Sequence, residues 1–144
     1  MRMLFTSALT ALSVACGGDE GTGVAQLLSV GGTYQTAVVL LQSSCQGTQV
    51  QTFPTVVTHT VGSSSLTLSH AGSTYSGTVD STGAFRSPEA PFTIGGTTYR
   101  IAITGTFTMT AMDATVTVAP QITPACSFTA RWQGPKSGPP NVIP

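Results

Sequence analysis

Apolar and polar residues alternate along much of the chain. The clearest case is the stretch TYRIAITGTFTMT, residues 98–110, which places Arg100 and a run of threonines on one side. The other side consists of Tyr99, Ile101, Ile103, Gly105, Phe107 and Met109. A period of two residues is that of a β-strand with one buried face, and the glycine within the apolar side is typical of a bend, a bulge or the close approach of another backbone. The pattern predicts a long, half-buried strand.

The same alternation recurs, separated by glycine-containing turns. Near the end of the chain Cys126, Phe128, Ala130 and Trp132 share one parity. The predicted turns lie at Gly62, Gly72, Gly83, the pair Gly95 and Gly96, and around Asp113. Such spacing is that of an antiparallel meander, and no segment after residue 33 shows helical spacing with caps. We therefore expect one domain of eight or nine strands over residues 24–133.

Eight antiparallel strands can close into a barrel or divide into a sandwich. In immunoglobulin sandwiches a tryptophan lies between the two cysteines of the disulfide, whereas Trp132 follows both Cys45 and Cys126. A bond between these cysteines would join strands that meet when a barrel closes. We expect an all-β fold, a small antiparallel, lipocalin-like up-and-down β-barrel of about eight strands, with a β-sandwich as the alternative.

The two ends of the chain differ from this domain. Residues 1–15, MRMLFTSALTALSVA, combine Arg2, an apolar run and a final Ala15, which is the anatomy of a bacterial export signal peptide. The glycine-rich and acidic segment at residues 16–23 predicts a flexible tether. Residues 134–144 are rich in proline, which lacks the donor that a central strand needs, so we expect a tail there.

The motif at the end of the predicted signal peptide indicates a role for the next residue, Cys16. LSVAC, residues 12–16, resembles a bacterial lipobox, in which lipid is attached to the cysteine and cleavage falls before it. Ser13 stands where leucine is usual, with Leu12 one position early. The alternatives are an ordinary cleaved signal peptide that leaves a spare thiol, or a start codon assigned too early.

Two further stretches extend this resemblance over most of the mature chain. They are LTLSHAGSTYSGTVDSTGAF at residues 66–85 and ACSFTARWQGPKSGPPNVIP at residues 125–144. With the lipobox-like start, the chain resembles a recurring type of bacterial lipoprotein with a small all-β domain. The resemblance implies a lipid-anchored protein of the cell envelope, and brings no activity and no site residues. Gly17 in place of the aspartate that marks inner-membrane retention favours the outer membrane, facing the periplasm or the exterior.

With Cys16 lipidated, Cys45 and Cys126 are left as an even pair in an exported chain. Oxidising compartments favour a disulfide between them, the alternative being two buried free thiols. Neither cysteine belongs to a CxxC motif, so redox catalysis and zinc fingers have no support.

Charge and the titratable residues limit the possible chemistry. Five basic residues balance five acidic ones without a basic cluster, so no nucleic-acid partner is expected. His59 and His70 are too far out of register to share zinc, by two or three residues, and we expect both to face solvent or lie in turns, with no metal and no cofactor. Acidic residues fall in or beside turns and no G-x-S-x-G elbow occurs, so no enzyme is expected.

Two functions from different classes remain. In the first, favoured by the tendency of inward apolar residues to be core, the protein is a non-catalytic structural or interaction module, anchored to the membrane by its N-terminal lipid and binding an unidentified protein through its outer surface. In the second, the barrel binds a small apolar ligand. The residues that would line such a site are Tyr75, Tyr99, Ile101, Ile103, Phe107, Phe128 and Trp132. The two functions differ in whether the interior is filled.

Overall fold

The computed structural model describes residues 25–122 and 126–144, so the predicted signal peptide, Cys16 and the whole of the predicted tether lie outside the described residues. The described chain forms nine β-strands, and none of its residues belongs to a helix that could cross a membrane. The strands are β1 (Gly32–Tyr34), β2 (Ala37–Ser43), β3 (Thr55–His59), β4 (Ser65–His70), β5 (Ser73–Val79), β6 (Ala84–Ile94), β7 (Thr97–Phe107), β8 (Ala111–Pro120) and β9 (Phe128–Ser137).

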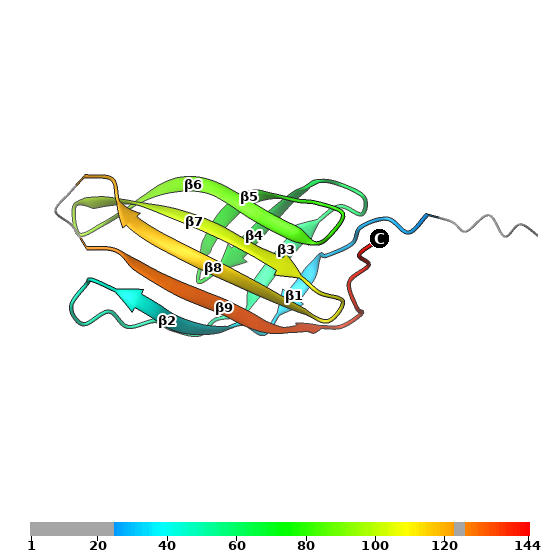
Figure 1. The fold of residues 1–144 in the computed structure, drawn as a ribbon, viewed down its shortest axis with the longest axis horizontal. Helices are drawn as coiled ribbons and strands as arrows, with labels where there is room; N and C mark the ends of the chain where they lie inside the picture. The colour runs from blue at the N-terminus through cyan, green and yellow to red at the C-terminus, as the bar shows by residue number, and fades with distance from the viewer. Residues whose placement is uncertain (1–24, 123–125) are drawn as a thin grey trace, which may run out of the picture.

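Eight of these strands close into an antiparallel barrel, shown in Figure 1. Strands β3 to β9 follow one another around the wall in chain order, and β1 completes the ring by pairing with both β3 and β9. Strand β2 is the additional strand and pairs with β9. The predicted all-β barrel is confirmed, and the alternative of a sandwich is excluded.

A break in the wall separates β1 from β2. Gln35 and Thr36 belong to neither strand, and beyond them β2 follows β9 without reaching β3. The returning segment 44–54 lies beside β2 instead: the Val38 N–H donates to Thr52 Oγ1 at 3.2 Å, and Thr36 Oγ1 donates to the Phe53 carbonyl at 2.6 Å. One end of the barrel is therefore walled partly by a loop.

The last strand extends further than the sequence predicts. A tail was expected from residue 134, yet β9 continues to Ser137, and Pro135 pairs with Ala111. On its other side Pro135 faces Gln35, in the break between β1 and β2, and its carbonyl accepts the Gln35 N–H at 2.8 Å. Because the ladder is already interrupted there, the missing proline donor removes little, and the prediction that residues 134–137 lie in a tail is wrong.

Gly105 and Met109 were both predicted to lie on the buried side of one long strand, and the structure explains the first and corrects the second. The strand stops at Phe107, so Met109, expected on the buried side, lies in the turn to β8 and is 64% exposed. At Gly105 the backbone of β8 approaches closely, because a Cβ there would collide with the carbonyl oxygen of Asp113. Close approach of a second backbone is thus the reason for this glycine.

The end of the barrel that carries both ends of the described chain is filled. Ser29 and Val142 form a bridge there, at the right of Figure 1. Inside, the ring of Phe107 lies 5.4 Å from that of Tyr34 and 4.4 Å from that of Phe85. The Tyr34 hydroxyl oxygen is 2.7 Å from the Val30 carbonyl oxygen and 2.8 Å from Asn141 Oδ1, and burial raises the pKa of Tyr34 to about 12.

Candidate ligand cavity

The opposite end of the barrel contains a cavity of about 340 Å³. Its walls come from the ends of the strands and from the loop 49–53 that lies beside β2. The aromatic lining residues are Phe53, Tyr75, Phe92, Phe128 and Trp132. The aliphatic ones include Val38, Ile101, Val116, Val118 and Ala130. Among the described lining residues there is no lysine, arginine, aspartate or glutamate, so the cavity is uncharged and mostly apolar, with Gln49, Gln51, His70 and Ser73 as its polar lining residues.

Strand alternation and register bring these side chains together. Trp132 of β9 pairs with Ala114 of β8 on one side and with Val38 of β2 on the other, so all three point to the interior. Ile101 pairs with Val118 in the same way. Small inward side chains leave room at this end: Ala130 lies between Phe128 and Trp132 on β9, and the facing positions of β8 are Val116 and Val118.

Only some of the seven residues named from the sequence line the cavity. Tyr75, Ile101, Phe128 and Trp132 line the cavity. Ile103 and Phe107 are fully buried in the core, at 0% and 2% exposure, and are not among the residues that line the cavity. Tyr99 stacks on Phe92, with ring centroids 5.6 Å apart, and is not part of the cavity lining either. A continuous interior set was expected, and the structure places four of the seven together.

Among the lining residues that sequence reasoning missed, His70 is the one with a titratable side chain. It was expected to face solvent or lie in a turn, but it is 6% exposed and stacks on Trp132, with ring centroids 3.8 Å apart. The signal was present: in Ser65–His70 the alternation puts His70 on the same face as Leu66 and Leu68. The expectation failed because the residue type was given more weight than its parity.

The two histidines are well separated. Thr55 pairs with His70 and His59 pairs with Leu66, so the histidines are four positions out of register along β3 and β4, one or two more than the sequence analysis assumed. His59 lies at the other end of the barrel, where its Nε2 is 2.8 Å from the Ser63 carbonyl oxygen. Within the described ranges no three His, Cys, Asp or Glu residues form a cluster that could hold a metal ion.

A chain of buried polar groups joins two residues of the lining, Phe53 and His70, through Thr36 and Thr55, which do not line the cavity themselves. Thr36 Oγ1 is 2.6 Å from the Phe53 carbonyl oxygen and 2.8 Å from Thr55 Oγ1. Thr55 Oγ1 in turn is 2.9 Å from Nδ1 of His70. Thr36 and Thr55 are 1% and 0% exposed, and burial lowers the pKa of His70 below its ordinary value. The imidazole is therefore neutral at neutral pH.

The second ring nitrogen of His70 is not used by this chain. Among the described residues only Nδ1 makes a hydrogen bond, and no buried side-chain nitrogen or oxygen of these residues lacks a partner. Nε2 is therefore reached by solvent rather than sealed in the wall. Since His70 lines the cavity, Nε2 is its one imidazole nitrogen available to a bound molecule.

The disulfide lies at the mouth of this cavity. Cys45 follows β2, Cys126 precedes β9, and their sulfur atoms are bonded, with Cα atoms 4.9 Å apart. Just inside the bond, Ser43 pairs with Phe128 and the Ser44 N–H donates to the Ser127 carbonyl at 2.9 Å. The predicted disulfide is confirmed, and it fixes the start of the loop that walls the cavity.

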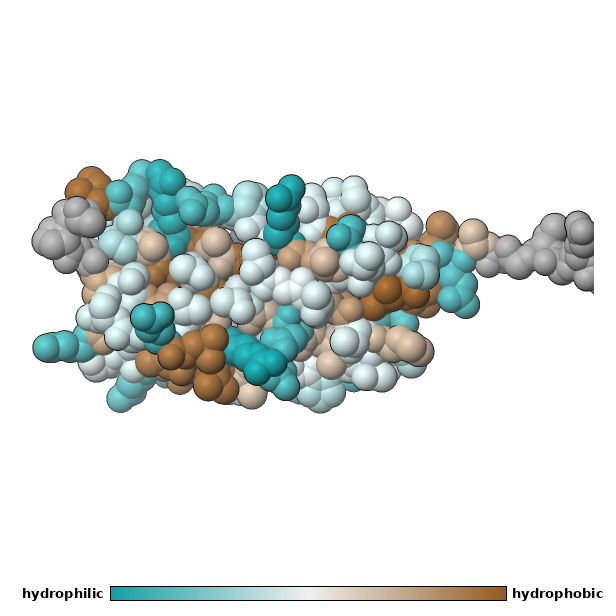
Figure 2. Space-filling view, in the orientation of Figure 1, coloured by the Kyte–Doolittle hydropathy of each residue, from teal (hydrophilic) through white to brown (hydrophobic). Residues whose placement is uncertain are grey.

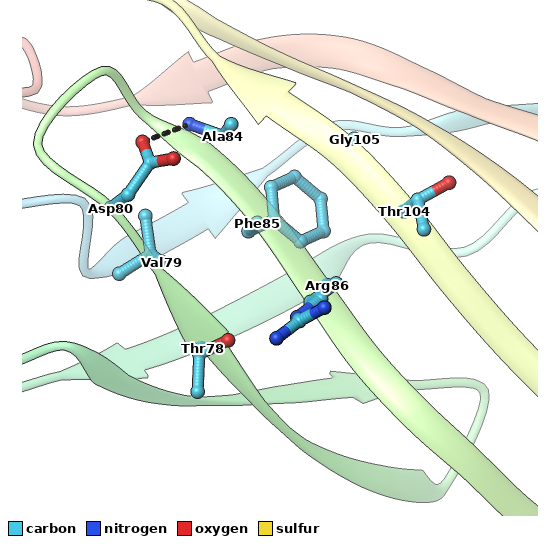
Figure 3. Close-up of a pocket in the computed structure, with 8 residues that line it drawn as sticks. All are labelled: Thr78, Val79, Asp80, Ala84, Phe85, Arg86, Thr104 and Gly105. Carbon is cyan, nitrogen blue, oxygen red and sulfur yellow. Dashed lines mark hydrogen bonds between the residues drawn. The ribbon is translucent and has the colours of Figure 1, made fainter.

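A second cavity, of about 590 Å³, lies where β5 and β6 separate (Figure 3). These strands pair only at Thr78 with Arg86 and at Val79 with Phe85. Its carboxylate, Asp80, accepts hydrogen bonds from the Thr82 and Ala84 N–H groups at 2.9 and 3.1 Å, and these bonds and that of the Thr82 hydroxyl lower its pKa. Asp80 is thus committed to its own turn, and the rest of the lining includes Arg86, Thr78 and Thr104, so this opening is charged and polar and suits an apolar ligand less well.

Two other acidic residues, Glu89 and Asp113, form ion pairs on the outer wall. Glu89 Oε2 is 3.0 Å from Arg100 Nη1, and Asp113 binds Arg131 through both carboxylate oxygens. The Asp113 pKa is lowered chiefly by the hydrogen bond from Arg131. Neither carboxylate lines the apolar cavity.

Comparison with known proteins adds no relative to this picture. No family model, no curated protein and no solved structure matches the chain.

Proposed function

We propose that this protein is a non-catalytic, lipid-anchored module of the bacterial cell envelope that binds a small apolar ligand in the open end of its barrel. The observation that carries the proposal is the apolar cavity of about 340 Å³ beside Trp132. Small-molecule pockets are commonly about 300–1,000 Å³, mostly apolar and aromatic, with a few placed polar groups. The sequence favoured the interaction module because inward apolar residues are usually core, and in the structure the interior is filled at the opposite end of the barrel.

The position of the cavity suits an anchored binder. The described chain begins at Ala25, at the filled end, where Ser29 is bridged to Val142. Lipid on Cys16 would be attached nine residues earlier, a span of at most about 30 Å. The mouth, at the disulfide end, would then face away from the membrane and towards the aqueous phase.

The first test is native mass spectrometry of the protein released gently from its membrane, followed by the denatured mass. An adduct present only in the native spectrum is expected, and would identify the ligand. Binding of 2-methylnaphthalene to the purified full chain, measured by equilibrium dialysis, tests the cavity itself. The variant Ala130→Leu places three more carbon atoms in the cavity and should abolish binding.

The matched control is Gln133→Leu, which adds an apolar side chain at an exposed position of the same strand. Binding retained in this control and lost in Ala130→Leu supports the proposal. Equal binding by both variants would place the probe elsewhere on the protein and overturn it.

One observation favours the interaction module as a second candidate. Val39 and Leu41 of β2 are 53% and 54% exposed, and Figure 2 shows an apolar patch over this strand. Among the described strands β2 pairs only with β9, and the segment 44–54 lies on its other side, so the exposed side chains of β2 are what this surface offers to a partner. Crosslinking in intact membranes tests it: a crosslinked partner lost in Val39→Lys/Leu41→Lys and retained in Ala130→Leu would assign the function to this surface.

A further inference from the structure

We propose that the ligand is a neutral molecule with a flat ring skeleton and a hydroxyl group, and that this hydroxyl donates a hydrogen bond to Nε2 of His70. The inference rests on the proposed function, since it specifies the ligand of the same cavity. It follows from the order of the protons along the buried chain that leads from Phe53 to His70.

The direction of that chain is fixed at its far end. The Phe53 carbonyl can only accept, so the Thr36 hydroxyl must donate to it. Having used its proton, Thr36 Oγ1 accepts from the Thr55 hydroxyl. Thr55 Oγ1 then has only lone pairs left for His70, so Nδ1 of the imidazole must carry the proton and donate it.

This order selects one tautomer of the neutral imidazole. With its proton on Nδ1, the ring has an unprotonated Nε2, which is a hydrogen-bond acceptor. A bound hydroxyl would satisfy that lone pair, whereas a molecule that offers only an acceptor would leave Nε2 without a donor. The fixed tautomer therefore discriminates between ligands of the same shape.

The rest of the cavity determines the remaining features of the ligand. A dry cavity of about 150 Å³ accepts benzene, and this one, at about 340 Å³, has room for two fused rings. Aromatic side chains, among them Phe53, Tyr75 and Phe128, surround the space and favour a flat ring skeleton. No charged residue of the described lining could neutralise an ionised ligand, so the molecule is uncharged.

The test compares 2-naphthol with 2-methylnaphthalene, which differ by a hydroxyl in place of a methyl group. Dissociation constants for the full chain are measured by equilibrium dialysis for the protein as it stands and for His70→Asn. The asparagine side chain retains an N–H that can donate to Thr55 and has no group in the place of Nε2. Since the methyl compound is the more hydrophobic, the informative quantity is the change in the ratio of the two constants.

We expect His70→Asn to lower the preference for 2-naphthol over 2-methylnaphthalene by about three- to tenfold, the range of one net hydrogen bond. Thr55→Val provides a second test that does not alter the imidazole. It removes the acceptor that fixes the tautomer, so the preference for 2-naphthol should fall there as well. Circular dichroism establishes that each variant folds, and Thr55→Val decides the outcome if His70→Asn does not.

The possible results separate the two proposals. A ratio that is the same in the unaltered protein and in the variants overturns the hydroxyl assignment while leaving ligand binding intact. If neither probe binds to the unaltered protein, the proposed function fails for molecules of this size, and the present inference fails with it.

Discussion

The imidazole of His70 lies flat against the indole of Trp132, with ring centroids 3.8 Å apart and planes inclined by 19°. One ring comes from β4 and the other from β9, which are not neighbours in the barrel wall. The stack therefore joins two strands that are not adjacent, and its imidazole is hydrogen-bonded to the buried Thr55. It joins a pH-sensitive group to the chain's single tryptophan, which makes Trp132 a reporter of this end of the barrel.

The buried imidazole predicts a loss of stability on mild acidification. The pKa of His70 is lowered by burial from its ordinary value of 6.5, so below that pH the unfolded chain binds more protons than the folded one. The contribution is fully present above the unfolded pKa and is lost as the pH falls through the folded pKa. Urea titrations should show a free energy of unfolding that declines as the pH is lowered from about 7 to 5.

In His70→Asn this decline should be much shallower, because the group that takes up the proton is gone. The lowered pKa values of Asp80 and Asp113 lie below 3.8, so losses from these carboxylates begin at more acidic pH. A slope between pH 7 and 5 that is unchanged in the variant would contradict the burial of a neutral imidazole.

The strand pattern could be predicted from the sequence because it depends on residue parity alone. The alternation in residues 98–110 and the glycine turns gave the barrel class, and the pairing of Cys45 with Cys126 followed from the number of cysteines. The cavity could not be predicted, because its volume depends on which inward side chains face one another across the barrel. Ile103 and Ile101 have the same residue type and parity, yet only Ile101 lines the cavity.

The break between β1 and β2 could not be predicted from the sequence either, although it is what lets a loop form part of the cavity wall. Nothing in Gln35 or Thr36 marks a strand end, since threonine is a common strand residue. The residue that marks it lies about a hundred positions away: Gly134, whose Cα faces the Gln35 backbone. A glycine that is required by a distant segment cannot be distinguished, in one sequence, from a glycine of a turn.

Gly134→Ala should destabilise the barrel strongly. A Cβ at this position would collide with the carbonyl group of Gln35 and with the Cα of Thr36, and these backbone atoms cannot turn aside as a flexible side chain could. We expect a loss of about 3 kcal/mol or more in the free energy of unfolding, at the upper end of overpacking effects. Gly31→Ala is the control, because its Cβ would come no closer than 3.3 Å to the nearest atom, the His59 carbonyl oxygen. Similar stability of the two variants would argue against the close approach of the β1–β2 break to β9.

Replacing Ala71 with asparagine should stabilise the protein. Ala71 and Gly72 form the turn between β4 and β5, and Ala71 has a φ of 50°, in the left-handed region that alanine adopts reluctantly. Asparagine tolerates this conformation and is preferred in two-residue hairpin turns followed by glycine. We expect a gain of about 0.5–1 kcal/mol by thermal or urea unfolding. Ala71→Val, a β-branched residue with no tolerance for positive φ, should lose stability, and the opposite order would refute the strained turn.

Loss of the disulfide should weaken the cavity end of the barrel in particular. The bond joins residues separated by 81 positions, and chain entropy for a loop of this size predicts a contribution of about 4–5 kcal/mol. In Cys45→Ser/Cys126→Ser, amide hydrogen exchange should accelerate most in residues 44–54, which wall the cavity, and least around Tyr34 at the filled end. Uniform acceleration in both regions would show that the bond stabilises the barrel as a whole and does not act on the mouth.

The anchor is tested by the cysteine outside the described residues. If lipid is attached to Cys16, then Cys16→Ser should move the protein from the membrane pellet to the soluble fraction, because acyl chains contribute about 0.8 kcal/mol per buried CH₂ and no other part of the proposal holds the protein to a membrane. The disulfide between Cys45 and Cys126 should form as before, since Cys16 has no part in it. The matched control is Cys45→Ser/Cys126→Ser, which should stay in the pellet despite its lower stability. If Cys16→Ser remained in the pellet after a high-salt wash, the attachment would lie elsewhere, and the argument that the cavity mouth faces away from the membrane would lose its premise.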